Sequence, residues 1–160
     1  MKHSFKIAAG VAAGALMLAA APADAGHGIA EQTIPLSSGQ ETGAGEPGGS
    51  GKITLEFYGP SGAVPVNHIC YELSTKKVGA QIGLHIHEAA RKVDGPVLVN
   101  LGAAAPTASG PLCVTVDDQT TFTNAVFDDL LESPTDYYVN YHTTAAPSGA
   151  IRGQLHGFGD

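Results

Sequence analysis

The sequence predicts an all-β fold, either a β-sandwich or a Greek-key barrel, with one short helix. Apolar and polar residues alternate in a series of short segments, and clusters rich in Gly and Pro separate these segments. Only one stretch has its apolar residues at helical spacing. The alternating segments number about seven or eight, which suits one domain of this architecture.

Alternation marks the expected strands, because successive side chains of a strand point to opposite faces. In residues 52–58, for example, Ile53, Leu55 and Phe57 share one face. Residues 97–101 are apolar on both faces, which is typical of a central strand. Polar residues on the remaining strands are expected to face water. The expected strands are 34–36, 52–58, 67–73, 80–88, 97–101, 112–116, 137–143 and 151–155.

Two segments depart from the β pattern. Residues 43–51 are too rich in glycine for a regular element and predict a loop. In residues 123–132 large apolar side chains recur at intervals of three and four, which predicts a short helix. Thr121 or Thr123 can cap its start, and Pro134 follows its end.

Residues 1–25 have the pattern of a secretory signal peptide. Two lysines precede an Ala-rich apolar run at 7–21, and a small-x-small processing site ends at Ala25. The run is short for a membrane span. We expect cleavage near Ala25, a secreted or periplasmic protein without a membrane span, and a single β domain over residues 26–160.

The charge of the chain narrows the range of partners. The formal net charge is −7 at pH 7. An acidic surface argues against nucleic acid and anionic membranes as partners. The expected partner is an extracytoplasmic protein of unknown identity or a metal ion, and the charge does not distinguish between them.

The chain has two cysteines, Cys70 and Cys113. An exported protein meets an oxidising environment, so a disulfide is the expected state. A thiolate metal site is the alternative, which the lack of a C-x-x-C pair disfavours. Both cysteines fall on the outward faces of their expected strands, consistent with a bridge between neighbouring strands.

A possible metal site begins with the segment Gly-Leu-His-Ile-His-Glu at residues 83–88. His85 and His87 are two apart in an expected strand, so both leave the same face. Imidazole is a common ligand of zinc and copper, and two such rings can tilt onto one ion. The alternative is two exposed polar residues on a half-buried strand.

Two later strands carry polar residues on the corresponding face. His142 is the expected third ligand, and three neutral imidazoles with an open position would form a reactive zinc or copper site. Arg152 would attract an anion there. Alternatively, His142 bonds to the following turn, and His68 and His156 are ordinary surface residues.

Several motifs in order resemble the CHRD (chordin-like) domain family, in its bacterial single-domain form. The resemblance implies an immunoglobulin-like β fold in an exported protein and a disulfide between Cys70 and Cys113. It implies no known reaction and no catalytic residue. The motifs are Leu-Ser-Ser-Gly-Gln-Glu at 36–41, Leu-His-Ile-His at 84–87, Gly-Pro-Val-Leu-Val at 95–99, Tyr-Val-Asn-Tyr-His-Thr at 138–143 and Gly-Ala-Ile-Arg-Gly-Gln-Leu at 149–155.

A more distant resemblance is to copper-zinc superoxide dismutase. Residues 83–88 are similar to a copper-ligand pair of that enzyme, and His142, Arg152 and an intrachain disulfide have counterparts there. The zinc ligands of that enzyme have no counterparts in this sequence. The resemblance implies a copper-dependent dismutase-like enzyme in which Arg152 steers superoxide and His68 or His156 supplies the fourth ligand.

Three functions therefore remain open for this chain. The preferred one is an exported binding or interaction module with a surface copper or zinc site at His85, His87 and His142, and no assigned catalytic residue. The dismutase-like enzyme is the first alternative. The second is a purely structural or adhesive domain whose polar strand faces bind another protein.

Overall fold

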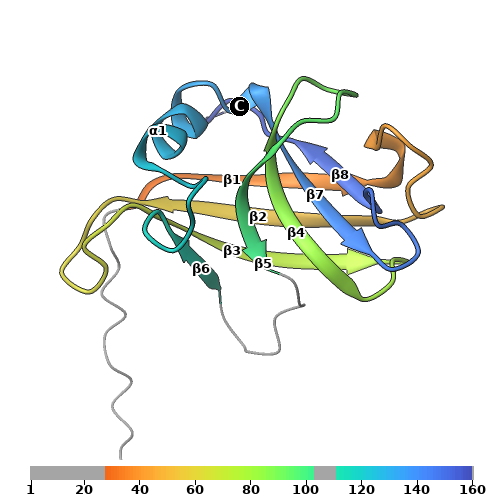
Figure 1. Cartoon of the computed structure of the whole chain (residues 1–160), viewed down its shortest axis with the longest axis horizontal. Coiled ribbons are helices and arrows are strands. Elements are labelled where there is room, and N and C mark those ends of the chain that lie inside the picture. The colour runs from red at the N-terminus through yellow and green to blue at the C-terminus, as the bar shows by residue number, and fades with distance from the viewer. Residues whose placement is uncertain (1–27, 103–110, 160) are drawn as a thin grey trace, which may run out of the picture.

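A computed structural model describes residues 28–102 and 111–159, so the expected signal peptide at 1–25 lies outside the described residues. No helix in the described part of the chain is both long and apolar enough to cross a membrane. In chain order, the elements are β1 (Gly28–Ser37), η1 (Ser38–Gln40), β2 (Ser50–Tyr58), β3 (His68–Lys76), β4 (Gln81–Glu88), β5 (Val97–Gly102), β6 (Leu112–Thr115), α1 (Asn124–Glu132), η2 (Pro134–Asp136), β7 (Tyr137–Thr143) and β8 (Ile151–Gln154) (Figure 1).

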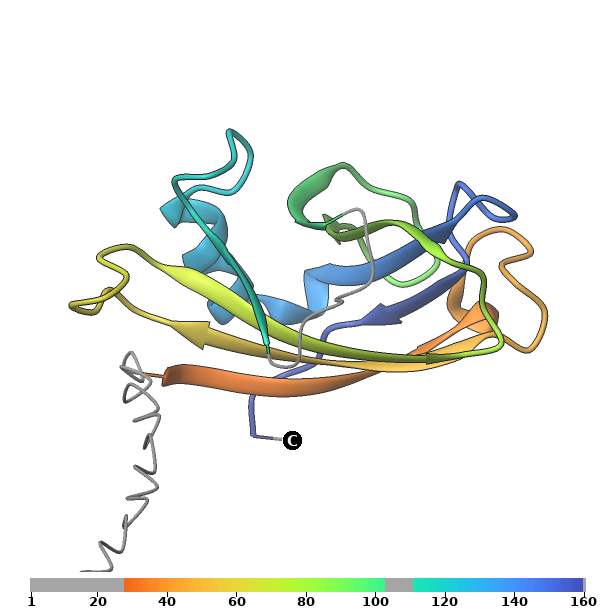
Figure 2. The ribbon, with the colours of Figure 1, turned by 90° about the horizontal axis from the view of Figure 1, so that it is seen from below.

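The strands form one eight-stranded sheet in the order β5-β4-β7-β8-β1-β2-β3-β6, and neighbouring strands are antiparallel. The sheet curls into a nearly closed barrel (Figures 1 and 2). β1 pairs with β2 along its length but with β8 only where Ser37 lies opposite Arg152. The all-β prediction is confirmed, and Arg152 lies at the join between the two halves of the sheet.

The apolar strand faces meet inside the barrel. Ile53, Leu55 and Phe57 of β2 are fully buried, as their alternation predicts. The helix α1 packs on this core, with the rings of Phe57 and Phe127 5.9 Å apart. Its N-cap is Thr123, whose hydroxyl accepts a hydrogen bond from a backbone N–H of the first turn at 3.3 Å. The predicted helix is therefore confirmed, with Thr123 as its cap.

The prediction that residues 97–101 form a central strand is wrong. β5 lies at one end of the strand order, and Val97 is 38% exposed. The side chain of Gln119 covers part of its free edge: it accepts from the backbone N–H of Asn100 at 2.7 Å and donates to the carbonyl of the same residue at 2.8 Å. An apolar run indicates that side chains are buried. It does not indicate how many neighbouring strands pair with the segment.

The second face of β4, β7 and β8 is also covered. Every residue of β7 is buried, including Asn140 and His142, which were expected to face water. Residues 89–96, which connect β4 to β5, and the turn at 147–149 hydrogen-bond to side chains of this face. The prediction of an open polar surface is wrong here, because connections between strands fold back over it.

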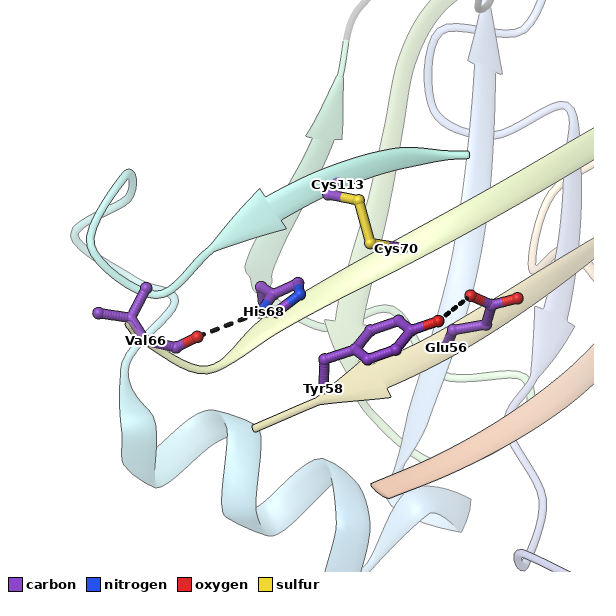
Figure 3. Close-up of a disulfide and its surroundings, with 6 residues drawn as sticks. All are labelled: Glu56, Tyr58, Val66, His68, Cys70 and Cys113. Atoms are coloured by element: carbon purple, nitrogen blue, oxygen red, sulfur yellow. Dashed lines mark hydrogen bonds between the residues drawn. A yellow bond between two sulfur atoms is a disulfide. The ribbon is translucent and has the colours of Figure 1, made fainter. Parts of the chain in front are cut away.

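A disulfide joins Cys70 of β3 to Cys113 of β6, as predicted (Figure 3). The two residues lie directly opposite each other in the strand register, with their Cα atoms 4.0 Å apart. β6 is short and lies at the other end of the sheet, so the bridge ties an edge strand to its only hydrogen-bonded neighbour among the described strands.

Removal of this bridge is expected to destabilise the fold. Closing a loop between residues 43 apart restricts the unfolded chain, and the chain-entropy relation gives a loss of about 4 kcal/mol in the free energy of unfolding when the bond is absent. Urea unfolding of wild type and of the double variant Cys70→Ser, Cys113→Ser measures this difference. Equal stabilities in urea would contradict it.

Candidate metal centre

Three histidines converge on the covered face of the sheet. Strand pairing sets His85 opposite Asn140 and His142 opposite Gly83, so His85 and His142 are diagonal neighbours on β4 and β7. The ring centroids of His85 and His142 are 4.8 Å apart. The centroid of the His87 ring lies 5.7 Å from that of His85 and 6.0 Å from that of His142. One nitrogen from each ring lies within 4.8 Å of the other two. These three residues are the histidine cluster.

Hydrogen bonds to backbone carbonyls fix the tautomers of two rings in the cluster, so that their other nitrogens have free lone pairs. His87 Nδ1 lies 2.9 Å from the carbonyl oxygen of Gly95, and His142 Nδ1 lies 3.1 Å from that of Pro147. A carbonyl oxygen only accepts, so each of these Nδ1 atoms carries the hydrogen and each Nε2 keeps its lone pair. Both Nε2 atoms are buried without a hydrogen-bond partner, as is Nδ1 of His85.

Burial also keeps the cluster neutral. Burial, together with the nearby rings of His142 and His87, lowers the pKa of His85 to about 4. Burial lowers the pKa of His87 and His142 as well, against the opposing effect of their backbone hydrogen bonds. Metal ligands must be deprotonated, so these imidazoles are ready to bind at neutral pH.

Gly83 provides the space for two of the rings. A Cβ atom at this position would lie 2.9 Å from Cε1 of His85 and 3.6 Å from Cδ2 of His142. Sequence reasoning did not assign Gly83 a role. The available signal was a glycine inside an expected strand, which often marks a close approach of other atoms.

The segment 89–96 forms the cover of the cluster and is held by Arg152. Nη1 of Arg152 donates to the carbonyl of Val93 at 2.8 Å, and Nη2 donates to that of Ala90 at 3.0 Å. The guanidinium carbon lies 3.3 Å from the centroid of the Tyr138 ring. The Tyr138 ring in turn stacks on His87, with centroids 4.8 Å apart and planes 8° apart.

The structure does not support the expectation that Arg152 steers anions. Its side chain is 1% exposed, and both terminal nitrogens donate to backbone carbonyls of the covering segment. A guanidinium that has no contact with solvent cannot bind an anion arriving from solvent directly. Arg152 instead positions the segment that contains the Gly95 carbonyl, the hydrogen-bond acceptor of His87.

Neither expected candidate for a fourth ligand lies in the cluster. The ring of His68 stacks on Tyr58, and its Nδ1 lies 3.1 Å from the carbonyl of Val66 (Figure 3). His156 lies near β1, with Nε2 3.2 Å from the carbonyl of Thr33. Within residues 28–102 and 111–159, the histidine cluster is the only grouping of potential ligands close enough to hold an ion. The structure therefore does not bring His68 or His156 to the cluster as a fourth ligand.

A buried carboxyl lies beside the site and was missed from the sequence. Glu41 follows η1, and burial raises its pKa to about 7, against the lowering effect of the Arg152 charge. One carboxylate oxygen of Glu41 and the amide oxygen of Asn140 are both buried without partners. A lone glutamate after a short turn gives no sequence signal of this burial.

Comparisons with known proteins identify the family of this chain. The fold and the site define an all-β domain with a covered cluster of three histidines. The chain belongs to the CHRD domain family, because the family model described as "CHRD domain" matches residues 32–155. A search of curated proteins found no match, and a search of solved structures found none either.

The substitution Glu41→Gln is expected to remove a pH dependence of stability. Because the pKa of Glu41 rises from 4.5 to about 7 on folding, the folded state holds this proton more tightly. The resulting stabilisation is full below pH 4.5 and is lost as the pH rises through about 7. In urea unfolding across this range, wild type should lose about 3 kcal/mol more than the variant.

The exposed carboxylate Glu31 offers a matched control for this measurement, because Glu31→Gln makes the same chemical change on the outer face of β1. Its stability should follow the wild-type curve. Parallel curves for wild type and Glu41→Gln would show that the buried carboxyl does not hold the extra proton.

Proposed function

We propose that this CHRD-family protein is an extracytoplasmic metal-binding module that holds one copper or zinc ion at His85, His87 and His142. The observation that carries the proposal is the set of three unpartnered ring nitrogens within one small, covered region. The residues fit such an ion, because zinc and copper both accept imidazole nitrogen and catalytic sites of this kind use three protein ligands with an open position.

The energetics of the cluster favour a bound ligand. A buried polar atom without a partner costs about 1–3 kcal/mol, and most buried polar groups in native proteins are paired. One ion would satisfy all three nitrogens of the cluster at once. The carbonyls of Gly95 and Pro147 already orient two of the rings, as second partners commonly do for metal-bound histidine.

The chain's own residues would control access and orientation at this site. Arg152 and Tyr138 hold the covering segment and the plane of His87, and Gly83 leaves room for His85. Bound copper would supply one-electron chemistry, and bound zinc would supply a Lewis acid. The site lies under residues 89–96 and the 147–149 turn, which corrects the expectation of a surface site.

The extracytoplasmic location is part of the proposal. The disulfide between Cys70 and Cys113 supports it, because such bonds persist in oxidising compartments. The dismutase-like alternative depended on Arg152 as an anion-steering residue, and burial of the guanidinium removes that support. The structural or adhesive alternative predicts that the histidines can be replaced without loss of function.

Elemental analysis of mature, tag-free protein from its native compartment, followed by copper and zinc titration, tests the proposal. We expect one ion per chain for wild type and a loss of affinity of at least ~100-fold for His87→Ala and His142→Ala, because each removes one of three ligands. His68→Ala and His156→Ala are the matched controls and should bind as wild type does. Wild type without saturable binding at micromolar concentration, or His87→Ala with full binding, would overturn the metal site.

The substitution Gly83→Ala is expected to weaken metal binding about 10-fold, since the added methyl group would displace the ring of His85. Gly43→Ala is the matched control, because a Cβ atom there meets nothing within 4 Å. Competition titration of the two variants against wild type measures the difference. Equal affinities for all three proteins would show that Gly83 does not shape the site.

A further inference from the structure

We propose that the histidine cluster selects monovalent copper, Cu(I), over Cu(II) and Zn(II). This inference rests on the proposed metal-binding function and adds the oxidation state and identity of the ion. Three features of the described residues carry it: the charge of the donors, the charge of their surroundings and the number of ligands.

The donors of the cluster are all neutral. No carboxylate or thiolate joins His85, His87 and His142 in the described part of the chain, and the only two cysteines form the disulfide. The ion therefore keeps its full charge after binding. His87 and His142 are 7% and 9% exposed, so that charge is held away from water. Because the Born cost scales with the square of the charge, a divalent ion costs roughly four times as much as a monovalent one.

The surroundings add positive charge. The imidazole of His87 and the guanidinium of Arg152 both lie close against the ring of Tyr138, and two groups this near cannot share one face of the ring. The ring is thus held between a metal ligand and a fixed cation. Lys92 is also close to this layer, since its Nζ donates to the carbonyls of Gly39 and Glu41 at 2.7 Å.

Two carboxyl groups lie near this layer, and the charge of Asp94 partly opposes that of Arg152 at His87. Asp94 lies 3.8 Å from Nη1 of Arg152, with its side chain 72% exposed. Glu41 lies beside Asn140 and is buried. Neither carboxylate belongs to the group of potential ligands, so neither neutralises a bound ion directly.

The ligand number points the same way. With three protein ligands, zinc completes its four-coordinate shell with a water or a substrate, and Cu(II) prefers a tetragonal set of ligands. Cu(I) is a closed-shell d10 ion that accepts three nitrogen donors without a fourth. His68 and His156 are held by other carbonyls, so the described residues offer three imidazoles. Zn(II) and Cu(II) would need further ligands from solvent, beneath a segment that Arg152 holds in place.

Competition titrations of metal-free, full-length mature protein test the inference. Cu(I) affinity is measured without oxygen against bicinchoninate, and Cu(II) and Zn(II) affinities are measured against chromophoric chelators of those ions. We expect Cu(I) to bind at least ~100-fold more tightly than either divalent ion. Copper retained by protein from its native compartment should be silent in electron paramagnetic resonance.

The outcomes separate this inference from the proposed function. Tighter binding of Cu(II) or Zn(II) at the same histidines would overturn the Cu(I) preference and leave the metal site standing. Failure of all three ions to bind would overturn both. These wild-type results decide the matter whether or not any variant folds.

A charge variant tests the physical cause. Asn140 lies opposite His85 in the strand register, and its amide oxygen is unpartnered, so Asn140→Asp places a carboxylate beside the cluster with little change in shape. The ratio of Cu(I) to Zn(II) affinity should fall about 10-fold. Asn124→Asp makes the same charge change on α1 and keeps the acceptor for Asn67, so its ratio should stay at the wild-type value. An unchanged ratio in a folded Asn140→Asp protein would contradict the electrostatic origin.

Discussion

The site depends on one buried cation. Arg152 lies on β8 at the single residue pair that joins this strand to β1. A buried guanidinium is costly unless its donors are paired, and here they reach the carbonyls of Ala90 and Val93. Those two bonds hold the covering segment against the sheet. Tyr138 packs between Arg152 and His87, so the same cation also supports the orientation of a candidate ligand.

The cover changes the chemistry of the face beneath it. On an open strand face, histidines would be hydrated and would titrate near neutral pH. Under the covering segment, burial lowers their pKa and leaves three ring nitrogens without partners. Glu41 and Asn140 add two more unpartnered atoms, so five of the seven such side-chain atoms in the described chain lie in this one layer. Unpaired buried groups concentrated in one place support the proposal that a ligand binds here.

The two ends of the sheet are secured by different means. At β6 the disulfide ties the short strand to β3, and at β5 the side chain of Gln119 bonds the free edge at Asn100. Exposed strand edges are prone to pair with other chains, and the Gln119 side chain occupies part of the free edge of β5.

The sequence by itself determined the local features of this protein. Alternation identified the strands except for residues 28–33 of β1, helical spacing identified α1, and the spacing of two placed His85 and His87 on one face. The pairing of the cysteines followed from compartment and strand faces. Each of these depends on residues close in the chain or on general chemistry. Only the tertiary structure decided that β5 is an edge strand, that His68 and His156 lie elsewhere, and that Arg152 and Glu41 are buried around the site. These depend on which connections fold over which strands, and contacts such as that between Arg152 and Ala90, 62 residues apart, leave no periodic pattern in the sequence.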